Sequence, residues 1–412
     1  MASTDRISTL DGVRGVAVMG ILAMNIVAFA MPEAAYDNPL VWGHRGDADL
    51  WSWATAFVLV DGKMRGLFSM LFGASMLLMY QRGIAAGEDA DATHRRRMAW
   101  LLVFGLIHYY LIWDGDILAL YALCGLVGLA MVHLDARTLI RLAVLLSIAA
   151  MALYVALALS MYATARDGLA AGASAADIAD YRSLMRDLGG PESTAALTKE
   201  IALFGGGYGG IVAHRIGPDW SGPLEVTFVY GLETLGLMAL GMAFLRNGFL
   251  AGEWTRSAYV RFASACYTVG VPPLILLALW CWRTGFEPVA VAGTTIAWSM
   301  PFRFAVMMGH AALIILLIKR WADTALVARI EAVGRTAFSN YLGTSIIMTL
   351  VFYGYGLGLF GQLSRWQAYL VCLPSWAAML WWSKPWLESY RYGPLEWLWR
   401  SLSRGHLEKM RR

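Results

Sequence analysis

The sequence predicts an all-α protein that crosses a membrane several times, and two observations predict this class. Of the 412 residues, 58% are hydrophobic and 15% are charged, whereas a soluble protein carries roughly a quarter charged residues. The apolar residues also form runs of about 20, which suit spanning helices and are too continuous for the alternating strands of a membrane barrel. This composition excludes an ordinary soluble enzyme.

About ten apolar runs are expected to span the membrane within a single transmembrane domain, 1–412. Their approximate ranges are 15–32, 51–80, 98–113, 116–132, 140–164, 225–245, 262–282, 289–318, 336–354 and 366–383. A short polar turn separates 98–113 from 116–132, so these two runs are expected to form a helical hairpin. The run 51–80 is longer than one span requires and has charged residues at its centre, so we expect it to be tilted or broken there.

The distribution of basic residues predicts the orientation, because cytoplasmic loops are enriched in Lys and Arg. With both termini in the cytoplasm, the cytoplasmic segments hold 22 of the 33 Lys and Arg residues. The three consecutive arginines at 95–97, directly before a span, are the strongest single indication of this orientation. A net charge of only +4, with basic clusters confined between apolar runs, speaks against nucleic-acid binding. Membrane lipids are the expected surroundings.

Two segments are expected to lie outside the membrane. On this orientation 166–224 is an extracytoplasmic loop, and its glycine-rich part, 204–210, is expected to be flexible and to touch the membrane or cover a pocket. The Trp-rich tail, 384–412, is expected to lie at the cytoplasmic interface. No metal site is expected, because all four cysteines lie in apolar runs without ligand spacing. Small residues at 231–241 leave a homodimer possible.

The first helix contains Asp11, Arg14 and Asn25. On a structural interpretation, Asp11 caps the helix and Arg14 lies among lipid headgroups. On a functional interpretation, the two form the mouth of a cytoplasmic pocket, where the guanidinium of Arg14 would bind a phosphate or carboxylate.

Charged residues also occur inside the second span, where Asp61 and Arg65 are four residues apart and could pair on one helix face. Lys63 would then point elsewhere, towards Glu233 or Asp11. A structural network and an anion-binding site both fit this pattern, because charges at membrane depth face the protein interior.

Two further polar residues belong to later spans. Arg303 is a buried cation that needs a partner, and Asn340 brings an amide into the start of the ninth span.

The third span contains the most chemically suggestive group. His108 precedes Asp114 by six residues and Asp116 by eight, or about two helical turns. Imidazole exchanges protons near neutral pH, and a nearby carboxylate would fix its tautomer and raise its basicity. Such a pair could deprotonate a hydroxyl that attacks an activated acyl group. The alternative is a histidine that only hydrogen-bonds a neighbouring helix. His44 is a second candidate base in the first extracytoplasmic loop.

Five stretches together resemble the bacterial YeiB family of inner-membrane proteins, a family of unknown function. They occur in the family's order along nearly the whole chain: Leu10 to Gly15 with Asn25, Lys63 to Gly73, His108 to Tyr121, Gly334 to Leu342, and Gly393 to Arg400. The resemblance implies a multi-pass protein of the bacterial inner membrane.

A more distant resemblance connects this family to transmembrane acyltransferases such as heparan glucosaminide N-acetyltransferase, through the Asp-x-x-Arg-Gly opening of the first helix. It implies that a cytoplasmic acyl-CoA donates an acyl group to a glycan-like acceptor on the far side, with a histidine central to transfer. His108 is preferred over His44, because His108 lies in a dense polar motif at membrane depth.

On the hypothesis of a membrane acyltransferase, the remaining polar residues have roles in binding and catalysis. Cations would complement the phosphates of CoA, and the amide of Asn25 or Asn340 would stabilise the oxyanion of the intermediate. The candidate donor-binding residues are Asp11, Arg14, Asn25, Lys63, Arg65, Arg303 and Asn340. The same buried cations could instead serve a transporter or channel for a small anion or metabolite, and a non-catalytic envelope protein is a third possibility.

Overall fold

The computed structural model describes residues 7–412, and this part of the chain is built from helices without a β-strand. Five helices are long and apolar enough to cross a membrane: α1 (Ser8–Ala30), α7 (Ala136–Gly168), α11 (Gly222–Arg246), α12 (Arg256–Arg283) and α14 (Met300–Arg320). Shorter apolar helices accompany them. The predicted all-α class of polytopic membrane protein is confirmed.

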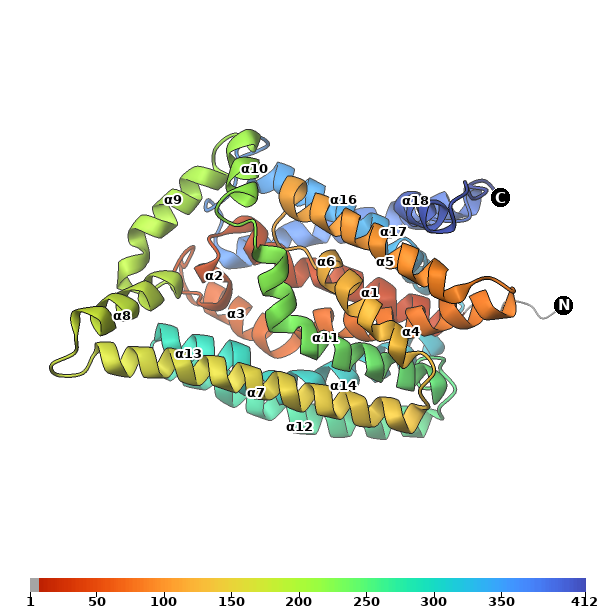
Figure 1. Cartoon of the computed structure of the whole chain (residues 1–412), viewed down its shortest axis with the longest axis horizontal. Coiled ribbons are helices and arrows are strands. Elements are labelled where there is room, and N and C mark those ends of the chain that lie inside the picture. The colour runs from red at the N-terminus through yellow and green to blue at the C-terminus, as the bar shows by residue number, and fades with distance from the viewer. Residues whose placement is uncertain (1–6) are drawn as a thin grey trace.

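The long helices run side by side in one bundle (Figure 1). The start of α1 and helix α18 lie at one end of it, as expected for two termini on the same side, and helices α8 to α10 lie at the other. The remaining bundle elements are α2 (Ala34–Asp37), α3 (Asp47–Leu59), α4 (Lys63–Ala85), α5 (Ala90–Ile107), α6 (Leu118–Gly128), η2 (Leu129–Met131), α13 (Pro288–Gly293), α15 (Ala325–Arg335), α16 (Ala337–Phe352), α17 (Arg365–Ser389) and α18 (Pro394–Arg404).

Two of the expected spans are interrupted. The run 51–80 is broken as predicted: α3 ends at Leu59, and Gly62 adopts a left-handed conformation (φ 71°) immediately before α4. The run 289–318, expected as one helix, is instead divided into α13, the π-helical turn η4 (Thr294–Trp298) and α14. The π turn widens the helix, and Pro301 lies in the first turn of α14, where a missing N–H costs nothing.

Helices α5 and α6 form the predicted hairpin. A π-helical turn, η1 (His108–Ile112), extends α5 before the chain reverses. The two helices pack so closely that a Cβ on Gly105 would overlap the backbone of Ala119. The turn between them carries the candidate histidine and its two aspartates.

The segment 166–224, expected to lie outside the membrane, is mostly helical; its extracytoplasmic position stays a prediction. It contains the end of α7, then α8 (Ala175–Asp187), η3 (Pro191–Ser193), α9 (Thr194–Phe204) and α10 (Tyr208–Ile216). A glycine-rich connection joins α9 to α10. Tyr208 then donates a hydrogen bond to the carbonyl of Leu111 (2.8 Å), so α10 lies over the turn that follows η1.

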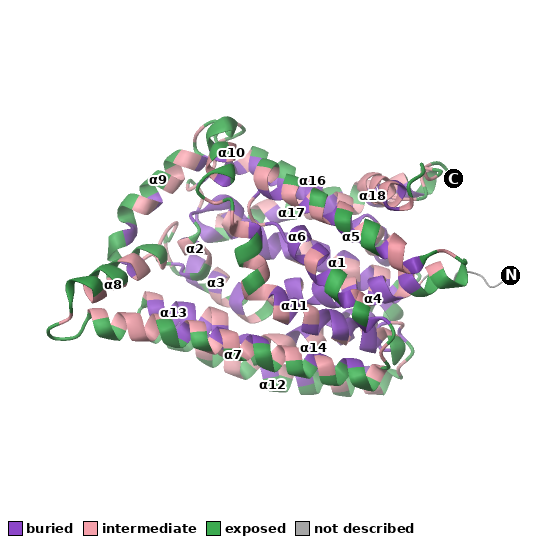
Figure 2. Ribbon diagram, viewed as in Figure 1, coloured by how far each residue is buried: buried purple, intermediate pink, exposed green. Residues whose placement is uncertain are grey.

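The burial pattern is that of a bundle surrounded by lipid. Buried residues concentrate between the helices, whereas the outer faces of α7 and α12 remain exposed (Figure 2). Large apolar side chains are exposed there, including Leu145, Ile148 and Leu276. Apolar surface on this scale is unfavourable in water and favourable against hydrocarbon.

Glycines set the closest helix crossings. A methyl group on Gly15 of α1 would overlap the carbonyl oxygen of Ile330 in α15, and one on Gly334 would overlap the carbonyl oxygen of Asp11. Gly73 of α4 and Gly241 of α11 make a second reciprocal crossing. Gly241 belongs to the small residues at 231–241 that allow a homodimer, and it packs against α4 of the same chain. The homodimer itself stays a prediction.

Replacement of Gly334 by alanine is expected to destabilise the protein by about 1–3 kcal/mol, because the added methyl must push α15 away from α1. Gly343→Ala is the matched control, since a methyl group added at Gly343 in α16 would meet no atom within 4 Å. Thermal unfolding of the purified variants in detergent measures both. Equal unfolding temperatures for the two variants would contradict the proposed crossing.

Candidate functional site

The centre of the candidate site is a buried pair formed by His108 and Asp116. Nδ1 of His108 lies 2.8 Å from Oδ1 of Asp116, and both side chains are buried. The other carboxylate oxygen of Asp116 accepts a hydrogen bond from the backbone N–H of Ala119 (2.8 Å), in the first turn of α6. With Asp116 ionised, Nδ1 carries the proton and Nε2 presents a lone pair.

The local backbone explains how this pair forms. His108 begins the π-helical turn η1, and its carbonyl accepts a hydrogen bond from the N–H of Trp113 (2.7 Å). The Trp113 ring then covers Gly115, where any Cβ would overlap it. Single π turns inside α-helices occur often at functional sites because they redirect a side chain. Here the tight turn returns the chain so that Asp116 faces His108.

Nε2 of His108 is buried and makes no hydrogen bond to any other described residue. The ring lies against Tyr341 and Trp113, with centroid separations of 5.2 and 6.2 Å. Trp113 in turn stacks on Phe29 of α1. A cavity of about 10 Å³, room for a single water molecule, is lined by Val18, Ile21, Leu22, Asn25, Phe29, Tyr341, Thr344 and Ser345. Tyr341 therefore contacts the His108 ring and also lines the cavity that Asn25 lines.

Asp114, the other predicted partner of His108, bonds elsewhere. Its carboxylate lies 3.4 Å from Nη2 of Arg215, a buried arginine of α10 that also donates to the carbonyl of Ile112 (3.0 Å). Asp116 alone therefore orients the histidine, and Asp114 fixes α10 over the turn. Arg215 was missed from the sequence because nothing in its local pattern distinguishes it from a surface arginine.

Asp11 and Arg14 form an ion pair of 3.2 Å near the start of α1, and Arg14 also donates to Ser75 of α4 (2.6 Å). Arg14 keeps about a fifth of its side chain exposed. Lys63 is twelve residues away from Ser75 along α4, which corresponds to about 18 Å. The structure therefore does not bring Arg14 and Lys63 into one cluster.

The predicted pairing of Asp61 with Arg65 is wrong, as is the expected contact of Lys63 with Glu233 or Asp11. Arg65 instead pairs with Glu233 of α11, with Nη2 3.0 Å from both carboxylate oxygens. Tyr154 of α7 donates a third bond to the Glu233 carboxylate (2.6 Å). Because this buried pair is internally neutral and bonded on several sides, it fits a structural role that joins α4, α7 and α11.

The other two buried cations bond to backbone oxygens. Lys63 donates to the carbonyl of Phe57, and Arg303 donates through Nη1 to the carbonyl of Thr295 (2.8 Å).

The structure places the last two candidates away from the dyad. The Asn340 amide donates to Thr336 (2.9 Å), and its oxygen accepts from Trp382 (2.9 Å), so it holds α16 against α17. His44 is exposed in the loop between α2 and α3. Asn25 is thus the remaining amide candidate, and it lines the small cavity together with Tyr341.

The closing stretch 393–400 fastens the tail to the bundle. The Glu396 carboxylate accepts hydrogen bonds from the backbone N–H groups of Phe338 (2.7 Å) and Ser339 (3.1 Å), which are otherwise unpaired donors at the start of α16. The Ser339 hydroxyl donates a further bond to it (2.5 Å). Glu396 therefore acts as an N-terminal cap supplied by a different helix.

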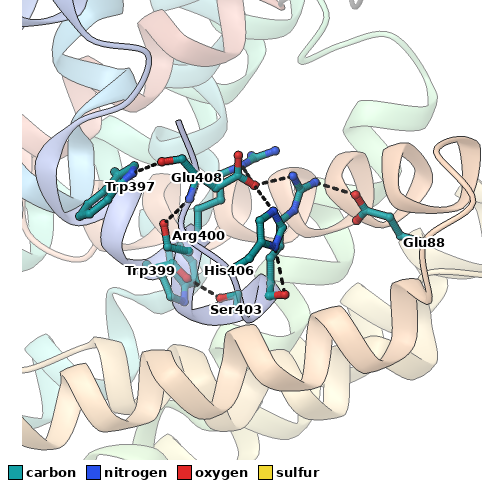
Figure 3. Close-up of polar contacts among 9 residues, drawn as sticks. Glu88, Trp397, Trp399, Arg400, Ser403, His406 and Glu408 are labelled. Atoms are coloured by element: carbon teal, nitrogen blue, oxygen red, sulfur yellow. Dashed lines mark hydrogen bonds and ion pairs between the residues drawn. The ribbon is translucent and has the colours of Figure 1, made fainter. Parts of the chain in front are cut away.

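Tail residues continue these contacts beyond Glu396. Trp399 donates to the carbonyl of Arg97 (2.9 Å), and the Arg97 guanidinium lies over the Trp399 ring. Figure 3 shows Glu408 and Glu88, two carboxylates that both pair with Arg404, at 2.7 and 2.9 Å respectively. The tail thus packs against the start of α5, at the end of the bundle where α1 begins.

Glu200 lies at the opposite end of the bundle, outside the spanning segments. This residue of α9 accepts a hydrogen bond from the backbone N–H of Glu33 (2.8 Å). Burial, and after it the negative charge of Glu33, raises the pKa of Glu200 to about 7.

These features define a helical membrane protein with a buried histidine–carboxylate dyad. The chain belongs to the YeiB family. It is 32% identical over 408 residues to "Uncharacterized protein YeiB" of Escherichia coli (strain K12), across 97% of this chain and 96% of that protein. It is 30% identical over 421 residues to "Uncharacterized protein YxaH" of Bacillus subtilis (strain 168), across 97% and 94%.

A family model adds a shorter match. Residues 244–406 match the model described as "Protein of unknown function (DUF418)". That range includes Arg303 and Glu396 and excludes the dyad. No solved structure matches the chain significantly. The names of these relatives give no activity, so the geometry around His108 and Asp116 is the basis for a functional proposal.

Replacement of Glu396 by alanine is expected to lower the free energy of unfolding by about 1–3 kcal/mol, because two helix N–H groups lose their acceptor. Glu388→Ala, which removes an exposed carboxylate of α17, is the control. Thermal unfolding in detergent checks both. An E396A protein as stable as the E388A protein would rule out the cap.

Replacement of Glu200 by glutamine is expected to flatten the dependence of stability on pH. With a folded pKa of about 7, well above the unfolded value, wild-type Glu200 holds a proton in the folded state that the unfolded state lacks. Stability is therefore lost as pH rises from about 4.5 to about 7. Glutamine keeps the acceptor for Glu33 and removes this loss.

Unfolding temperatures at acid and alkaline pH measure this effect. The E200Q protein should exceed wild type on the alkaline side only. Identical pH profiles for E200Q, wild type and the exposed control Glu192→Gln would contradict the assignment.

Proposed function

We propose that the chain is an integral-membrane acyltransferase of the bacterial inner membrane, which moves an acyl group from a cytoplasmic acyl-CoA to a hydroxyl or amine of an extracytoplasmic, glycan-like acceptor. One observation carries the proposal: the buried His108 is bonded to Asp116 through Nδ1, and its Nε2 has no partner among the described residues. A histidine held in this way is arranged to accept a proton from a nucleophile.

The proposed reaction follows from that geometry. Nε2 of His108 takes the proton of the acceptor hydroxyl or amine as its oxygen or nitrogen attacks the thioester carbonyl carbon. The resulting imidazolium is stabilised by the Asp116 carboxylate, and the amide of Asn25 is the candidate donor to the oxyanion. When the intermediate collapses, the carbon–sulfur bond breaks, and the CoA thiolate takes the proton back from His108. The products are the acylated acceptor and free CoA.

Arg14 is the residue best placed to bind the donor. Its guanidinium is partly exposed at the end of the bundle where α1 begins, and Asp11 and Ser75 hold it in place. A guanidinium pairs well with phosphate oxygens. Arg14 and Asn25 are eleven residues apart on α1, or about 16 Å. The extended pantetheine arm of CoA would connect the two positions. Lys63, Arg65 and Arg303 are not needed for this role.

The alternative function is transport of a small anion. The observation that favours it is the presence of buried cations, Lys63 and Arg303, that bond only to carbonyl oxygens. Transport predicts saturable flux of the anion into proteoliposomes without covalent change. Acyl transfer predicts release of CoA that depends on the acceptor.

Asp116→Asn is expected to slow acyl transfer by about 10²-fold or more, and His108→Ala by a similar factor, because the general base loses its orientation or is removed. Asp114→Asn is the matched control. Asp114 lies on the same turn but pairs with Arg215, so this variant should stay within a few fold of wild type.

The assay is the release of free CoA thiol by purified protein in nanodiscs, supplied with acetyl-CoA and a panel of amino sugars and oligosaccharides. Folding of each variant is checked by its unfolding temperature. A folded H108A protein with the wild-type rate, or equal losses in D114N and D116N, would contradict the proposed base.

A further inference from the structure

Three cations lie near Asp61, between α3 and α4. They are Lys63 at the start of α4, Arg303 in the first turn of α14 and Arg365 at the start of α17, and we refer to them as the cation cluster. Gly62, the residue between Asp61 and Lys63, lies against the Arg303 side chain. Arg365 donates to the carbonyl of Tyr36, whose hydroxyl reaches Asp61 (3.5 Å). Segments that are distant in the sequence therefore bring three positive charges close to Asp61.

None of the three cations makes an ion pair with a carboxylate of residues 7–412. Their hydrogen bonds run to backbone carbonyls: Lys63 to Phe57, Arg303 to Thr295, and Arg365 to Ala35 and Tyr36. Lys63 and Arg365 are almost fully buried. The arrangement differs from that of Arg65, whose charge is matched directly by Glu233.

Carboxylates lie near the cluster but do not bond to it directly. The nearby Asp61 carboxylate accepts a long hydrogen bond from the Tyr36 hydroxyl (3.5 Å). The three cations therefore depend on backbone carbonyls, in a setting where a charge without a close counterion is costly. An additional anion would give them a direct partner.

The unbonded nitrogens have the geometry that an oxyanion requires. Nε and Nη2 of Arg303, which lie along one edge of the guanidinium, are buried without a partner, and so is Nε of Arg365. Two N–H groups on one guanidinium edge match two oxygens of a carboxylate or phosphate. Gly62 lies beside that edge. A Cβ at this position would come within 2.8 Å of Cδ and 3.2 Å of Nε of Arg303, so glycine leaves this space unoccupied.

The cluster lies next to polar residues that are exposed at the end of the bundle that carries α2. Asp37 is exposed and Tyr36 and Asp61 are partly exposed, and Arg365 donates to the carbonyl of Tyr36. Arg14, the proposed donor-binding residue, lies towards the opposite end.

We propose that the cation cluster binds the carboxylate or phosphate group of a small anionic ligand that enters past α2. Nε and Nη2 of Arg303 donate to two oxygens of the anion, and Lys63 and Arg365 supply further positive charge beside it. The site does not depend on acyl transfer by His108. An acceptor that carries an acidic sugar or a phosphate would use it to anchor its anionic group, and so would a transported anion.

The test uses the full-length protein, purified in detergent, with inorganic phosphate and glucuronate as probes and glucose as the neutral control. Both anions should raise the unfolding temperature saturably, and glucose should not, because ligand binding to the folded state stabilises it. The dissociation constants should be at least about tenfold higher for Arg303→Gln, and also higher for Arg303→Lys, which keeps the charge and loses the fork. Arg166→Gln, which alters an exposed arginine of α7, should bind like wild type.

Parallel measurements in nanodiscs distinguish the source of the anion. Stabilisation by phosphatidylglycerol, compared with phosphatidylcholine alone, that is lost in R303Q assigns the site to a lipid headgroup. Stabilisation by the free anions assigns it to a soluble ligand, and either result supports the site. Absence of any anion effect in both settings, or equal effects in R303Q and R166Q, overturns it.

A measurement on the wild-type protein tests the site without depending on the folding of variants. Tungstate, a strongly scattering analogue of phosphate, should give density between Arg303 and Arg365 in a cryo-electron microscopy map. A map with tungstate bound elsewhere and none at the cluster would also overturn the proposal.

Discussion

Charges inside an apolar bundle have to be neutralised or hydrogen-bonded where they lie, and this requirement positions every part of the candidate site. Arg65 pairs with Glu233, and Tyr154 donates to the same carboxylate, which fixes the relative placement of α4, α7 and α11. Arg215 pairs with Asp114, which holds α10 over the turn after η1. His108 bonds to Asp116 through Nδ1, and its Nε2 is left without a partner among the described residues. The proposed chemistry would occur at this nitrogen.

The stretches that resemble the YeiB family contain two kinds of residue. Some hold helices together, and others are the proposed chemical groups. Gly15 and Gly334 allow α1 and α15 to touch through their backbones, and Glu396 caps the start of α16. These contacts join stretches that lie far apart in the sequence. His108 and Asp116 make no comparably close helix crossing, and burial of such a dyad costs free energy. The unpartnered Nε2 of His108 supports the proposed chemical role.

Local sequence was sufficient where the interaction itself is local. The apolar runs predicted the fold class, the polar turn at 114–116 predicted the hairpin, and the charges at 61–65 predicted the break before α4. The sequence also predicts that His108 pairs with one of two nearby aspartates, because only eight residues separate His108 from Asp116. The sequence does not predict which aspartate it is, since that depends on Arg215, about a hundred residues further along the chain. The same limit explains the wrong pairing of Arg65 with Asp61. Spacing along one helix can be read from the sequence, whereas a partner 168 residues away, Glu233, cannot.

Acyl transfer as proposed requires that a donor held at one end of the bundle delivers its acyl group to His108. A cryo-electron microscopy structure of the wild-type protein with a non-hydrolysable acyl-CoA analogue tests this requirement. We expect density with the phosphates beside Arg14 and the acyl carbonyl within about 3–4 Å of Nε2 of His108. A bound analogue whose acyl end lies away from His108, or a saturating concentration that leaves no density in the bundle, would contradict it.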